Sequence, residues 1–76
     1  MNNQRRKALS EINQRAEDLH SELEELRDEE QEYIDNMPEN LHQGERAEMA
    51  EIAVTEMDNA ISSLEDITGS LEEAQA

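Results

Sequence analysis

A heptad repeat of apolar residues constrains the fold of this chain more than any other feature. From Leu9 to Met37, apolar residues recur at alternating steps of three and four positions, and only Glu30 interrupts them. A second stripe runs from Ala47 to Leu71 at the same spacing. This alternation is typical of amphipathic helices that pack against another helix. The sequence therefore predicts an all-α fold with two long helices.

The composition points the same way. In 76 residues there is no Cys, Trp or Phe, and only one Tyr, one Pro and two Gly. Sandwiches and barrels need many aromatic strand residues and turn residues, so a β fold is not expected. No apolar run approaches the roughly 18 residues of a membrane span, and no apolar segment follows the basic N-terminus. We therefore expect a soluble, cytoplasmic chain without disulfides and without contact to a membrane.

The segment between the stripes combines Pro38 with Asn and Gly residues, which favour a turn. The pattern predicts one domain, residues 1–76, with helix one at about 4–36, a connection at 37–44 and helix two at about 45–74. A connection this short folds long helices back as an antiparallel, coiled-coil-like hairpin. The expected register places residue i opposite 81 minus i, which brings residues 5–7 beside Glu72 and Glu73. Gly69 is expected to weaken the last turns of helix two.

Helix two is apolar over a wider arc than one partner helix can cover, because Ala53, Ala60, Ile67 and Ala74 add a second row. A two-helix hairpin of this size rarely folds stably without a further layer. We therefore expect a C2 homodimer in the form of a four-helix bundle. The residues expected in the hydrophobic seam of the hairpin and dimer are Leu19, Leu23, Leu26, Met57, Ile61, Leu64 and Ile67.

Two Glu-x-x-His patterns, Glu17 to His20 and Glu39 to His42, have the spacing that some helical-bundle proteins use for metal ligands. The heptad register argues against a metal site. It places Glu17 and His20 beside or away from the seam, and the second pattern lies in the connection. No serine has a histidine at helical spacing on its own face, and no EF-hand loop is present. We expect no catalytic residue, no metal, no cofactor and no enzymatic activity.

The charge of the chain is strongly acidic and unevenly distributed. Twenty-one acidic and six basic residues give a net charge of −15, yet residues 1–15 hold four basic residues and one acid. Such a surface repels nucleic acid and membranes and attracts basic proteins. The best candidate for a partner-binding face is an acidic row on the outer side of helix one, interrupted only by Arg27. The row consists of Glu22, Glu25, Asp28, Glu29 and Glu32.

Parts of the chain resemble short acidic proteins of bacteriophages and mobile elements, a group with no established activity. The resemblance rests on Asp28–Tyr33, on Asn36-Met37-Pro38-Glu39-Asn40-Leu41, on Gly44-Glu45-Arg46 and on the Leu-Glu-Glu-Ala heptads of the C-terminal part. It implies a phage protein made in the cytoplasm of an infected bacterium. The related chains tend to carry Ser where Gly44 stands, so this chain lacks the side chain that would cap helix two.

Two hypotheses about function follow. In the first, the acidic row imitates a phosphate backbone and occupies the basic groove of a host defence or nucleic-acid-handling protein. In the second, the chain is a structural or adaptor coiled coil that binds another helix through its seam. Glu30, the polar residue in the first stripe, either reaches water or Arg46, or determines register or partner choice.

Overall fold

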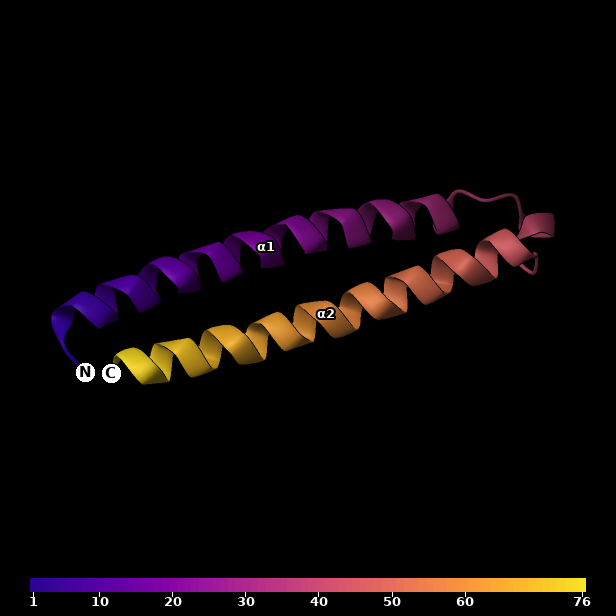
Figure 1. The fold of residues 1–76 in the computed structure, drawn as a ribbon. Helices are drawn as coiled ribbons and strands as arrows, with labels where there is room; N and C mark the ends of the chain where they lie inside the picture. The colour runs from indigo at the N-terminus through magenta and orange to yellow at the C-terminus, as the bar shows by residue number, and fades with distance from the viewer.

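The computed structural model describes all 76 residues as two long helices that pack against each other without any strand (Figure 1). Helix α1 spans Asn3–Asp35, a 3-10 turn η1 spans Glu39–Leu41, and helix α2 spans Glu45–Gln75. The predicted all-α helical hairpin is confirmed, and the helix ends lie within one residue of the expected positions. The molecule is a rod of 59 × 14 × 13 Å. Neither helix is apolar enough over a sufficient length to cross a bilayer.

Local chemistry explains where the helices begin. The Asn2 side chain accepts a hydrogen bond from the Arg5 backbone N–H at 2.8 Å and caps α1. Gly44 stands at the N-cap of α2 and offers no side-chain bond. Instead, Glu45 and Glu48 place negative charge in the first turn, where the helix dipole is positive. Helix α2 continues through Gly69 to Gln75.

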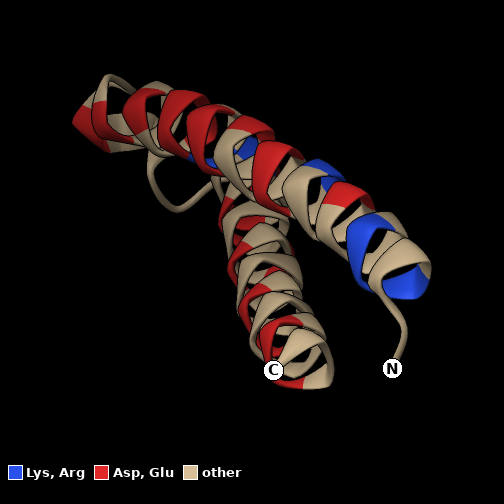
Figure 2. Cartoon of the chain, turned by 90° about the vertical axis from the view of Figure 1, so that its left-hand side faces the viewer, with Lys and Arg blue, Asp and Glu red and all other residues tan.

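The buried core is small and lies mainly near the turn. Only five of the 76 residues are buried, and three of them, Ile34, Ala50 and Val54, form one cluster. The other two are Ala16 and Ala47. Seen from the end that carries the termini, the two helices diverge, and the N- and C-termini are well separated (Figure 2). The hairpin is therefore closed at its turn and open at its termini.

Helix α2 packs through the residues that the heptad pattern predicts. Its buried or partly buried positions include Ala47, Ala50, Val54, Met57, Ile61, Leu64, Thr68 and Leu71. Ile67, which was also expected in the seam, is 47 % exposed. The face of α2 that packs on α1 is therefore the predicted one. The second apolar row of α2, which includes Ile67, lies at the edge of this face.

Helix α1 packs through a different face, and this corrects the predicted contact between the helices. Leu23 is partly buried as expected, but Leu19 and Leu26 are 52 % and 55 % exposed. His20 and Arg27, each one position further on, lie at the inter-helix contact instead. From there both side chains reach acids of α2. In this orientation of α1 the two leucines lie at the side of the hairpin.

The register between the helices also differs from the expected one. His20 pairs with Glu65 and Arg27 pairs with Asp58, so facing residue numbers add up to 85 rather than 81. The difference is about one helical turn, roughly 6 Å. It arises because the connection, with its 3-10 turn, carries the chain past the end of α1 before α2 begins. As a result, residues 5–7 make no ion pair with the acidic C-terminal end of α2.

Candidate functional site

The acidic row on α1 is fully available to a partner. All five carboxylates, Glu22, Glu25, Asp28, Glu29 and Glu32, belong to exposed residues. Only Asp28 has an ion-pair partner, Arg27, at a long 3.5 Å. Acidic residues recur along most of α1 beyond its basic N-terminal end, as the red segments in Figure 2 show. The structure therefore presents this row as one surface of negative charge that is compensated only at Asp28.

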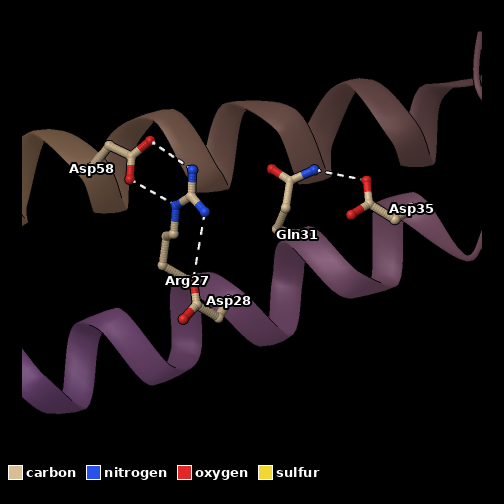
Figure 3. A network of polar contacts seen from close by, with 5 residues as sticks. All are labelled: Arg27, Asp28, Gln31, Asp35 and Asp58. Atoms are coloured by element: carbon tan, nitrogen blue, oxygen red, sulfur yellow. Dashed lines mark hydrogen bonds and ion pairs between the residues drawn. The ribbon is translucent and has the colours of Figure 1, made fainter.

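Arg27 does not interrupt this surface as the sequence suggested. Its guanidinium lies toward α2, where Nε donates to Asp58 Oδ1 at 2.8 Å and Nη2 donates to Oδ2 at 3.4 Å (Figure 3). The hydrogen bonds to Asp58, reinforced by the charge of that carboxylate, raise the pKa of Arg27. The bidentate geometry fixes the side chain in this direction. The only basic residue within the row is thus held mainly toward α2, and its one contact with the row is the long one to Asp28.

A second polar contact joins the helices at His20. Its Nε2 lies 3.0 Å from Glu65 Oε1 on α2, and its Nδ1 lies 2.9 Å from Glu24 Oε1 one turn further along α1. The hydrogen bond to Glu65 is the main cause of a raised pKa for His20, and the charges of both acids add to it, against a smaller opposing effect of desolvation. The imidazole therefore holds its proton, and both ion pairs, to a higher pH than a free histidine.

This contact predicts a pH-dependent stability. Because the pKa of His20 in the folded chain lies above its ordinary value of 6.5, the stabilisation is present in full below pH 6.5 and is lost as pH rises through the folded pKa. The melting temperature should fall between pH 6 and pH 8.5 by more in the parent than in His20→Gln. Equal changes in the two proteins would contradict the role of the ion pairs. The site is exposed, so a small difference is expected.

The two predicted Glu-x-x-His patterns are used for other contacts. His20 pairs with Glu24 and Glu65 and does not face Glu17. His42 Nε2 donates to the Met37 carbonyl at 2.8 Å within the turn. No group of three or more potential ligands in the chain is arranged to hold a metal ion.

An apolar row on α1 lies beside the acidic row, and the sequence pattern did not separate the two. Leu19 and Leu26 line a shallow surface groove of about 490 Å³ together with Glu22, Glu25 and Glu29. A partner that binds the acids therefore also meets exposed leucines. The signal was visible in the sequence, since the leucines stand at the heptad positions that were assigned to the inter-helix seam.

The turn carries two further recesses that share Tyr33, Glu45 and Arg46. One, of about 570 Å³, is completed by Asn36, Met37, Pro38, Leu41 and Gly44. The other, of about 450 Å³, is completed by Glu30, Met49 and Ala50. Glu30 and Arg46 thus line the same recess, yet they form no ion pair.

Three comparisons, with protein-family models, with curated proteins and with solved structures, found no match to this chain.

Proposed function

We propose that this chain is a phage-type acidic binding protein that inhibits a host defence or nucleic-acid-handling protein by occupying its basic groove, in the manner of a DNA mimic. The observation that carries this proposal is the exposed acidic row of α1, with Arg27 held mainly toward Asp58 of α2. The resemblance to short acidic phage proteins supplies the setting, the cytoplasm of an infected bacterium. The partner is a basic host protein.

The spacing of the row supports mimicry of a phosphate backbone. Carboxylates three or four residues apart on a helix lie about 5–6 Å from each other, the scale of several Å on which phosphates recur along a nucleic-acid strand. Glu22, Glu25, Glu29 and Glu32 follow this spacing. Because α1 is a rigid rod, the charges are already positioned before binding, which lowers the entropic cost of association.

The exposed leucines favour a second candidate function. Leu19 and Leu26 stand at heptad spacing outside the contact between α1 and α2, as a helix-binding adaptor would require. In that case the acids serve to keep the protein in solution. We also propose that two hairpins associate into a four-helix bundle, because five buried residues form a very small core for 76 residues.

Salt dependence of host-protein binding distinguishes the two functions. The immobilised protein should capture a nucleic-acid-binding protein from bacterial lysate, and added double-stranded DNA should displace it. The affinity for the purified target should fall steeply between 50 and 200 mM salt if several charges of the row are engaged, because salt screens exposed charge pairs. Weak salt dependence together with no displacement by DNA would reject mimicry and favour the helix-binding adaptor.

A further inference from the structure

One side of the hairpin is apolar and has no partner within the chain. On α1, Ile12, Leu19, Leu26 and Tyr33 are exposed at intervals of seven residues, and on α2 the exposed Met49 and Ile67 are eighteen residues, or five full turns, apart. Tyr33 and Met49 line the same recess, so the two rows lie on the same side of the hairpin. These six residues are termed the apolar face.

The exposed surface is large enough for a stable interface. The chain exposes 5845 Å², whereas a compact monomer of 8.7 kDa exposes about 4,700 Å². The excess, roughly 1,100 Å², exceeds the area of about 800 Å² that each partner buries in a standard interface. Covering the apolar face with a second copy would bring the exposed area per chain to that of an ordinary folded protein.

The charges within α1 point to a second copy and to its direction. Residues 1–15 hold four basic residues, Arg5, Arg6, Lys7 and Arg15, and none forms an ion pair within its own chain. Residues 16–35 hold ten acids and one arginine. The basic and acidic parts of α1 are thus complementary to each other, and one straight helix cannot bring them together. Two antiparallel copies of α1 can.

We propose that a second copy covers the apolar face with the two hairpins antiparallel, so that α1 lies along α1 of the partner and the turns are at opposite ends. This inference rests on the proposed dimerisation. Each basic N-terminal segment then lies beside the acidic part of the other α1. Arg15, one turn before Leu19, stands at the edge of the interface.

The opposite arrangement, with both turns at one end, is electrostatically worse. It places α1 of one chain along α2 of the other, and at the register of the hairpin the ten acids of residues 16–35 then face residues 50–69 of α2. That stretch carries five acids and no basic residue. Like charges at such an interface reduce its affinity. Antiparallel hairpins also set the closed turn of one chain against the open end of the other.

The acidic row lies at the edge of the interface in this dimer. Glu22, Glu25 and Glu29 border the leucine groove and therefore lie at the edge of the covered surface. Glu32 stands three residues after Glu29, which turns it by about 60° around the helix, further from the apolar face. The dimer therefore presents two acidic rows.

Distances between spin labels test the arrangement. The chain has no cysteine, so Asn40→Cys places one label in the turn of each copy. Because α1 has 33 residues, or roughly 50 Å of helix, antiparallel hairpins should give a label separation of roughly 50 Å or more. A separation below about 25 Å, as expected when both turns lie at one end on the scale of packed helices, would overturn the arrangement while leaving dimerisation intact.

Sedimentation equilibrium of leucine variants tests the face itself. Leu19→Asp combined with Leu26→Asp should raise the dimer dissociation constant by roughly 100-fold or more, because four charges would be buried per dimer. The control is Ile52→Asp, since Ile52 is 58 % exposed but lies outside the apolar face. A parent protein that sediments as a monomer at micromolar concentration would overturn the proposal, without affecting the DNA-displacement test. Dimers unaffected by the leucine substitutions would also overturn it.

Discussion

Replacing Ile34 with aspartate is expected to unfold the hairpin. Ile34 is only 6 % exposed and packs on Ala50 and Val54, which together form the one cluster of buried side chains. A carboxylate there has no cation within the cluster, so the folded state should lose about 3 kcal/mol or more. With so small a core, this loss is comparable to the total stability of the fold. Circular dichroism at 25 °C should show loss of most of the helical signal.

The matched control is Ile52→Asp on α2. Ile52 is 58 % exposed, so the same change in chemistry should alter the free energy of unfolding by less than about 0.5 kcal/mol. If Ile34→Asp retained the helicity and melting temperature of this control, the cluster near the turn would not be what holds the two helices together.

Neutralising the acidic row is expected to weaken binding to the host target by at least roughly 100-fold. The variant combines Glu→Gln or Asp→Asn at Glu22, Glu25, Asp28, Glu29 and Glu32. Each substitution eliminates a charge-assisted contact with the basic groove of the target. The losses from the five substitutions combine and lower the affinity for the target. The helix should persist, because exposed positions contribute little to folding. Titration calorimetry with the purified target measures the loss, and circular dichroism verifies the fold.

A second variant distinguishes the effect of removing this row from the effect of lowering the net charge of the protein. It carries the same amide substitutions at five exposed acids of α2, which are Glu51, Glu56, Asp66, Glu72 and Glu73. Both variants lose five negative charges. The α2 variant should bind the target within a few fold of the parent, since only long-range attraction changes. Equal losses in the two variants would show that overall charge, and not this row, determines binding.

The hairpin and the packed face of α2 could be predicted from the sequence because only one face of α2 is apolar at heptad spacing over its whole length. The packed face of α1 could not. Leu19 and His20 each belong to a row with steps of three and four, and both rows share Leu9, Ala16, Leu23 and Glu30. In the observed packing, His20 and Arg27 contact acids that lie some 30 to 45 residues away along the chain, at Asp58 and Glu65, and local spacing does not reveal such contacts.

The candidate site was predictable to a similar degree. The acidic row follows directly from helical spacing, but its uninterrupted character depends on the direction of Arg27. That direction is determined by Asp58 on the other helix, and the register between the helices was predicted one turn away from the one observed. Contacts of this kind need the exact path of the turn, which local sequence preferences do not specify.

The uneven distribution of buried residues determines the order in which the hairpin forms and opens. Ile34 and Ala50 are separated by only sixteen positions, so the loop that joins them closes at low entropic cost and can act as the folding nucleus. The pairs further out then add in sequence, from Arg27 with Asp58 to His20 with Glu65. Amide hydrogens should therefore exchange slowest beside the turn and progressively faster toward both termini. Local unfolding should therefore begin at the termini and proceed toward the turn. The centre of the acidic row lies in the half of α1 next to the turn, which should stay helical longest.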